Sequence, residues 1–149
     1  MNNYRRRIVV DLRFEAAVGE VSRALREEGL QSIARIDVRQ LFWRDLAHEF
    51  RNYLLLEAWS PELALEALRH NLDVGTLLPT IFAIYELTDT RTAVVANEAL
   101  PSTAPELDSR LEEAPALATI ADQERQRIDR VLARVRQSSH APASILPAA

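Results

Sequence analysis

The sequence predicts an α+β domain in which an antiparallel or mixed sheet of about five strands carries helices on one face. Three observations support this fold class. The spacing of apolar residues switches repeatedly between strand and helix periods, in the order β-α-β-α-β-α-β-β-α. The dipeptide Ser60-Pro61 is a strong helix-start signal in the middle of the chain. The length of 149 residues, with 48% hydrophobic and 27% charged residues, is typical of one globular domain.

The first third of the chain predicts two strands and two helices. Residues 5–13 mix basic and β-branched residues and predict a strand. Gly29 is placed to end the helix that follows in a left-handed conformation, and the apolar stripe of this helix is Phe14, Ala17, Val18, Val21 and Leu25. Residues 30–38 alternate in polarity, which predicts a half-buried strand. Asp37 then caps a short helix with Gln40 as its reciprocal partner, and this helix is expected to turn inward Leu41, Phe42 and Leu46.

The middle of the chain predicts a buried strand, a helix and a hairpin. Residues 53–58 are apolar apart from one carboxylate, and the helix that starts at Ser60-Pro61 ends near His70. Its inward side carries Leu63, Ala64, Ala67 and Leu68. Residues 77–87 and 92–96 form two strands joined by a short turn, which predicts a hairpin.

The last part of the chain predicts a loop, one long helix and a tail. Pro101 and Pro105 mark the loop, and the helix covers about residues 116–136. Its apolar stripe is Leu117, Ile120, Ile128, Val131, Leu132 and Val135. We expect a single domain over residues 1–137 and a disordered tail over residues 138–149.

Several absences limit the chemistry. The chain has no cysteine, which excludes disulfides, thiolate catalysis, iron–sulfur clusters and cysteine zinc sites. All 18 basic residues are arginine, so lysine Schiff-base chemistry and a P-loop lysine are also excluded. With three glycines, the chain has no glycine-rich loop to cradle a phosphate.

Charge and hydropathy indicate the compartment and the partners. The net charge of -4 argues against a protein that binds nucleic acid mainly by electrostatics. No segment approaches the roughly 20 apolar residues that span a bilayer. The apolar run after Arg5-Arg6-Arg7 is too short for a signal peptide. We therefore expect a cytoplasmic protein that binds neither a membrane nor nucleic acid.

An ordered series of short motifs runs through the middle of the chain: Ile36-Asp37-Val38, Tyr53 to Pro61, Leu77-Leu78-Pro79-Thr80 and Ile84-Tyr85-Glu86. Over about residues 8–135 this series resembles a bacterial family called domain of unknown function 302. The resemblance implies a compact α+β fold and self-association, without a settled biochemical activity.

The sequence departs from the pattern of that family at two positions. Trp59 and Thr80 stand where the family usually has two cysteines, at the end of one strand and the start of another. Any thiol, redox or metal role of such a pair cannot operate here. We expect instead a modest pocket or groove near Glu57, Trp59 and Thr80, which Trp59 either fills or lines with an aromatic wall.

Other candidate residues each allow two interpretations. Glu57 is either a pocket carboxylate with a raised pKa or a surface partner of an arginine. Glu86, next to Tyr85, forms either an ion pair across the hairpin or a contact in a cleft. His48 and His70 match no metal-ligand spacing, so neither a metal nor another cofactor is predicted.

Three hypotheses on function follow. The first is a non-enzymatic protein that binds a small ligand or assembles as a homodimer, with an exposed Trp43 at the subunit contact. The second is a small enzyme in which Glu57 accepts a proton, assisted by His48 or Tyr85. The third is an interaction module that docks through its C-terminal helix. The residues leave open whether the protein is an enzyme, and the first hypothesis is preferred because no catalytic constellation is present.

Overall fold

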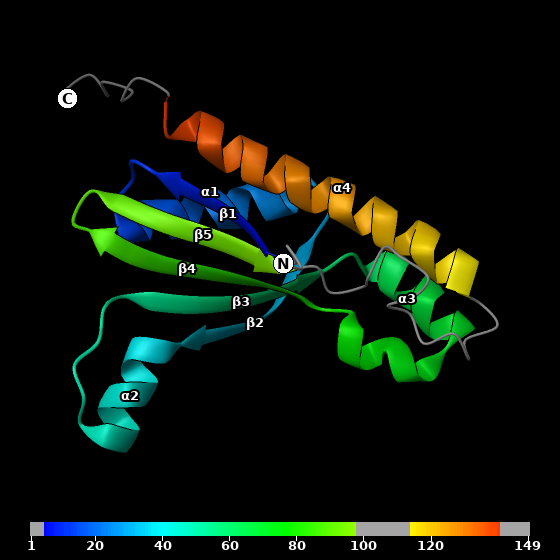
Figure 1. Ribbon diagram of the computed structural model, residues 1–149, viewed down its shortest axis with the longest axis horizontal. Coiled ribbons are helices and arrows are strands. Elements are labelled where there is room, and N and C mark those ends of the chain that lie inside the picture. Colours follow the sequence, from blue (N-terminus) through cyan, green and yellow to red (C-terminus); the bar gives the residue numbers. More distant parts are fainter. Residues whose placement is uncertain (1–4, 98–113, 141–149) are drawn as a thin grey trace, which may run out of the picture.

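The computed structural model describes residues 5–97 and 114–140. The predicted proline loop and most of the predicted tail lie outside these residues. Five strands form one sheet in the order β1-β5-β4-β3-β2, and every neighbouring pair is antiparallel (Figure 1). The strands are β1 (Arg5–Val10), β2 (Gln31–Asp37), β3 (Tyr53–Trp59), β4 (Thr80–Thr88) and β5 (Arg91–Asn97). The predicted α+β class is confirmed, with the antiparallel form of the sheet.

Four α-helices and one short 3-10 helix complete the described chain. They are α1 (Phe14–Glu27), α2 (Val38–Leu46), α3 (Pro61–His70), η1 (Leu72–Leu77) and α4 (Ala114–Ser138). Helices α1 and α4 cover one face of the sheet, called here the inner face, and they also pack against each other. Helices α3 and η1 pack together beside the first half of α4, whereas α2 stands apart from the other helices (Figure 1). None of the described helices is long and apolar enough to cross a bilayer.

The predicted helix starts and ends are confirmed at three positions. The hydroxyl of Ser60 accepts a hydrogen bond from the backbone N–H of Leu63 at 3.4 Å. The carboxylate of Asp37 accepts one from the N–H of Gln40 at 3.0 Å. Gly29 has a φ of 73°, a left-handed conformation that glycine adopts without steric cost. These local signals are reliable because each satisfies backbone groups that a helix end leaves unpaired.

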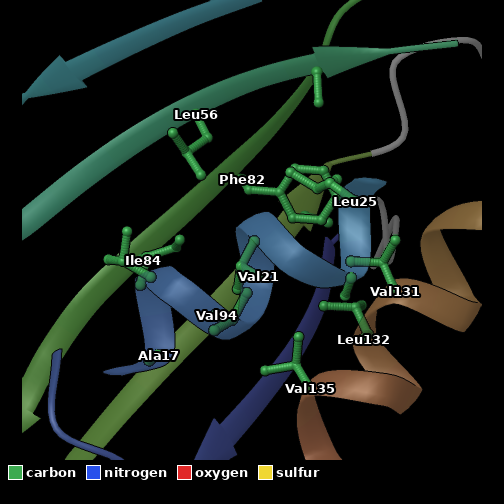
Figure 2. Packing of buried hydrophobic residues seen from close by; sticks show 14 of the residues in the cluster. Ala17, Val21, Leu25, Leu56, Phe82, Ile84, Val94, Val131, Leu132 and Val135 are labelled. Atoms are coloured by element: carbon green, nitrogen blue, oxygen red, sulfur yellow. The ribbon is translucent and has the colours of Figure 1, made fainter. Parts of the chain in front are cut away.

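Two hydrophobic clusters lie on the inner side of the sheet. In the larger one, α1 is held between the sheet and α4 (Figure 2). Its labelled side chains are Ala17, Val21 and Leu25 from α1, Leu56, Phe82, Ile84 and Val94 from the sheet, and Val131, Leu132 and Val135 from α4. The second cluster joins α3 and η1 to the first half of α4. The inward stripe predicted for the last helix is therefore divided between two cores.

The structure corrects two expectations about burial. Strand β2 was expected to be half-buried, but six of its seven residues are exposed. The reason is its position at the edge of the sheet, beyond the area that α1 covers. The helix after it buries no residue, and Leu46, expected to face inward, is 71% exposed. Periodicity identifies an apolar face, but it does not tell whether a partner element covers that face.

Candidate functional site

No helix of the described residues covers the centre of the face of the sheet opposite α1 and α4, called here the open face. One row of residues in register crosses all five strands. It consists of Arg7, Val95, Ala83, Leu55 and Ile36, and none of the five is buried. Ile81 adds another exposed apolar side chain from β4. This face resembles one half of a sheet-on-sheet core, in which the inner faces of two sheets meet.

Two charges stand on opposite sides of the open face. Arg7 lies on β1, and its Nε donates a hydrogen bond to the hydroxyl of Tyr85 at 3.4 Å. Glu57 lies on β3, in register with Ile81 and Ala34, and is half-buried. Among the described residues, no hydrogen bond or ion pair to Glu57 is found. Arg7 and Glu57 therefore place opposite charges on the two sides of an apolar centre.

A ladder of aromatic rings connects the open face to α2. Tyr53 and Tyr85 stack with their ring centroids 5.2 Å apart and 6° between the planes. Phe50 contacts Tyr53 at 6.2 Å, and Phe42 of α2 meets Phe50 edge-on at 5.1 Å. These contacts hold α2 beside the aromatic end of the open face.

Strand β2, helix α2 and the following loop form an arm, defined here as residues 31–52. No residue of the arm is buried. It nevertheless carries four exposed large apolar side chains: Ile33, Ile36, Trp43 and Leu46. The exposed fraction of Trp43 is 58%, which confirms the predicted exposure of this residue. A helix as short as α2 is marginal on its own in water, so the arm is a segment that further burial would stabilise.

His48 lies in a shallow cleft of the arm with a volume of about 380 Å³. The cleft is lined by side chains of mixed character: Asp37, Arg39, Gln40, Trp43, His48 and Glu49. The backbone N–H of His48 donates a hydrogen bond to the carbonyl of Phe42 at 3.2 Å, whereas its imidazole makes none with another described residue. No cluster of three or more histidine, aspartate or glutamate side chains that could hold a metal ion occurs in the part of the chain that the structure describes.

Thr80 lies on the inner side of the sheet, away from Glu57. Its hydroxyl donates a hydrogen bond at 3.2 Å to Oε1 of Glu124, a residue of α4 that is only 5% exposed. Burial raises the pKa of Glu124 to about 7, while the hydrogen bond from Thr80 and the charge of Arg127 act in the opposite direction. Near neutral pH this carboxyl therefore holds its proton part of the time.

A hydrogen-bonded group of polar side chains lies near Glu124, at the start of α3. Arg127 donates a hydrogen bond to the hydroxyl of Ser60 at 3.1 Å, and that hydroxyl donates to Glu62 at 3.0 Å. Trp59, Ser60 and Glu124 border a closed gap that has no room for a water molecule. Trp59 is half-buried and packs against the cluster of α3, η1 and α4. Trp59 therefore fills this region and does not line an open pocket.

Glu86 makes a contact that sequence reasoning did not foresee. Its carboxylate accepts a hydrogen bond from Nδ2 of Asn52 at 2.9 Å, and its backbone carbonyl accepts one from Arg51 at 3.1 Å. The residue fastens the end of the arm to β4. This is a structural contact and not an ion pair across the hairpin.

The structure thus distributes the predicted site residues over four places: the open face, the arm cleft, the inner polar cluster and the junction between the arm and β4. Glu57 and Tyr85 share the open face, but their strand positions differ by four residues, which corresponds to about 13 Å along the strand. Glu57 and Thr80 lie on opposite faces, so no single pocket joins them.

Glu124 is the residue that sequence reasoning missed. A signal for it exists in the last helix, where it follows Ile120 by four residues and precedes Ile128 by four. A carboxylate at this spacing lies on the inward stripe of the helix. A charged residue at a predicted core position is therefore the pattern that would have found it.

Comparison with known proteins gives a family and a fold. A family model described as "Domain of unknown function DUF302" matches residues 7–135. The crystal structure of an uncharacterized conserved DUF302 protein from Bacillus stearothermophilus is similar, with a TM-score of 0.74 and 21% sequence identity. The similarity covers 90% of this chain and 99% of that chain. No curated protein matches the chain.

Proposed function

The chain belongs to the DUF302 family, and from this premise we propose that it acts as a homodimeric assembly protein whose two copies join through the open face and the arm. The observation that carries the proposal is the arm, because residues 31–52 include no buried residue and four exposed large apolar side chains. Monomeric proteins seldom expose contiguous apolar patches of more than a few hundred Å².

A second copy fits the open face better than an unrelated partner does. In a two-fold interface the same surface meets itself, so it must be complementary to itself. A two-fold axis that runs along the strands between β5 and β4 places β1 of one copy over β3 of the other. Arg7 then lies over the partner's Leu55, in the row next to the one that holds the partner's Glu57, and the apolar centres of both faces meet. The opposite charges supply complementarity, and the aliphatic row supplies the area to be buried.

The arm extends this interface. Trp43 and Leu46 lie on the free side of α2, and Ile36 continues the apolar row of the open face onto β2. Aromatic side chains that fill a partner's surface dominate the energy of many interfaces. The helix, marginal on its own, would gain its stability from the second copy.

The other hypotheses gain less support. Catalysis by Glu57 requires a second titratable group within hydrogen-bond reach, and Tyr85 directs its hydroxyl toward Arg7 instead. Docking through the last helix requires a free apolar surface there, but the stripe of α4 is buried in both clusters.

Sedimentation velocity over a range of protein concentrations tests the proposal. We expect a dimer for the unaltered chain and a folded monomer for Trp43→Asp combined with Leu46→Asp. Leu72→Asp is the matched control, because Leu72 is even more exposed than Trp43 and Leu46 but lies on η1, outside the arm. A monomer at all micromolar concentrations for the unaltered chain contradicts the proposal, as does a dimer that persists in the arm variant.

A further inference from the structure

A separate cleft lies on the inner side of the sheet, between α1 and β2. Its volume is about 430 Å³, within the roughly 300–1,000 Å³ of small-molecule sites. Ser22 and Arg26 of α1 form one wall, Ser32 and Arg35 of β2 form the other, and Leu30 and Leu56 lie at the bottom. The cleft is on the opposite side of the sheet from the open face.

The topology explains why the cleft exists. Strand β2 is the edge strand, and six of its seven residues are exposed, so α1 leaves much of this strand uncovered. A register irregularity between Ser32 and Ala34 shifts the strand, so that Ser32 and Arg35 both point to the inner side, opposite Ala58 and Leu56. The result is a trough whose apolar floor belongs to the core and whose rim is polar.

The charge of the cleft is its distinctive property. One arginine stands on each wall, and no acidic residue is among its lining residues. The guanidinium groups of Arg26 and Arg35 make no hydrogen bond or ion pair with another described residue. In contrast, Arg130 and Arg134 both bind Glu28, at 2.7 and 2.8 Å. In a chain of net charge -4 with many carboxylates, two unpaired guanidinium groups at one cleft call for an external anion.

The remaining polar groups also suit an anion. A guanidinium group offers paired N–H donors that match the two oxygens of a carboxylate or phosphate. The hydroxyl of Ser32 and the side-chain amide of Gln31 are further donors at the rim, and no described residue accepts a hydrogen bond from either. Leu30 and Leu56, both nearly fully buried, close the bottom with apolar atoms. The arm cleft differs, because Asp37 and Glu49 would repel an anion there.

We infer that the cleft between α1 and β2 binds a small organic anion, with a carboxylate or phosphate group held between Arg26 and Arg35 and a short apolar body on the leucine floor. Ser32 and Arg35 belong to the arm, but they point to the inner side of the sheet, away from the open face. Binding at the cleft is therefore independent of assembly.

Titration with hexanoate, followed by amide chemical shifts in two-dimensional NMR of the full chain, tests the site. We expect saturable shifts confined to the α1–β2 turn and to β2, and no such shifts with hexylammonium, which has the same apolar body and the opposite charge. A parallel titration with hexyl phosphate tells whether the carboxylate or the phosphate group binds better. Arg26→Gln and Arg35→Gln should each weaken hexanoate binding about tenfold.

Controls separate this site from the rest of the protein. Arg69→Gln is the matched control, because Arg69 is an exposed arginine on α3, away from the cleft, and we expect hexanoate affinity to stay unchanged. The arm variant with Trp43→Asp and Leu46→Asp should also bind hexanoate, whether or not it dimerises. Absence of saturable shifts, shifts that map to the open face, or equal affinity of the double arginine variant and the unaltered chain would each overturn the inference.

Discussion

The hydroxyl of Thr80 lies 3.2 Å from Oε1 of Glu124, and this contact joins the first residue of β4 to the middle of α4. Both residues are buried, so the hydrogen bond lies inside the protein.

Replacing Glu124 by glutamine should make the stability of the protein less dependent on pH. The pKa of Glu124 is about 7 in the folded protein, against an ordinary value of 4.5. The folded state thus holds a proton that the unfolded state releases, and stability falls as pH rises from about 4.5 through about 7. At about 1.4 kcal/mol per pKa unit, this group alone lowers the free energy of unfolding by about 3 kcal/mol.

Urea denaturation at about pH 5 and about pH 8 measures this effect. We expect Glu124→Gln to be more stable than the unaltered protein at the higher pH, since its neutral amide still accepts the hydrogen bond from Thr80. Glu66→Gln, at an exposed position of α3, is the control and should leave the pH profile unchanged. An equal slope for Glu124→Gln and the unaltered protein would disprove the prediction.

Replacing Thr80 by valine should raise the pKa of Glu124 further. The hydrogen bond from Thr80 favours the charged carboxylate, and valine keeps the shape of threonine without the donor. A titration of the Glu124 side-chain carboxyl by carbon NMR measures the shift. Thr80→Ser, which keeps the hydroxyl, should leave the pKa close to its original value, and an unchanged pKa in Thr80→Val would count against the contact.

Replacing Ser60 by alanine should destabilise the fold by about 1–2 kcal/mol, the usual range for losing a helix cap. The hydroxyl accepts hydrogen bonds from Leu63 and Arg127, so its loss leaves the start of α3 and one guanidinium without a partner. Thermal or urea unfolding provides the measurement. Ser60→Thr retains the hydroxyl and should recover most of the lost stability; a neutral effect of alanine would show that the cap contributes little.

The two leucines Leu56 and Leu65 should respond differently to the same substitution. Leu56 is 2% exposed in the larger core, whereas Leu65 is 51% exposed on α3. We expect Leu56→Ala to cost about 2–5 kcal/mol through lost burial and the cavity left behind, and Leu65→Ala to cost less than about 1 kcal/mol. Comparable losses in urea denaturation would contradict the assignment of β3 to the core.

A cysteine placed on the open face should report the dimer directly. The chain has no cysteine of its own, so Ala83→Cys carries a single thiol in the central row of the open face. We expect a short bismaleimide to convert this variant into covalent dimers at low micromolar concentration. Leu65→Cys, on α3, serves as the control and should remain monomeric on denaturing gels. Equal cross-linking of the two variants would argue against an interface on the open face.

The local elements of this protein were predictable because local interactions determine them. Gly29, Asp37 and Ser60 each satisfy backbone groups within a few residues, and all three were identified from their neighbours in the sequence. The start of β4 was less accurate, because Leu77 belongs to η1 and the strand begins only at Thr80. A short apolar run can form either a helical turn or a strand. Packing against α3 favours the helical turn here.

The sequence by itself determined the order of strands and helices, the capped helix ends, the family and the absence of thiol and lysine chemistry. Only the tertiary structure decided that β2 is an edge strand, that the arm buries nothing, and that Glu124 meets Thr80 across 44 positions of the chain. The physical reason is that burial and pKa depend on which surfaces meet. Long-range packing decides which surfaces meet, and the spacing of apolar residues within one helix or strand does not reveal it.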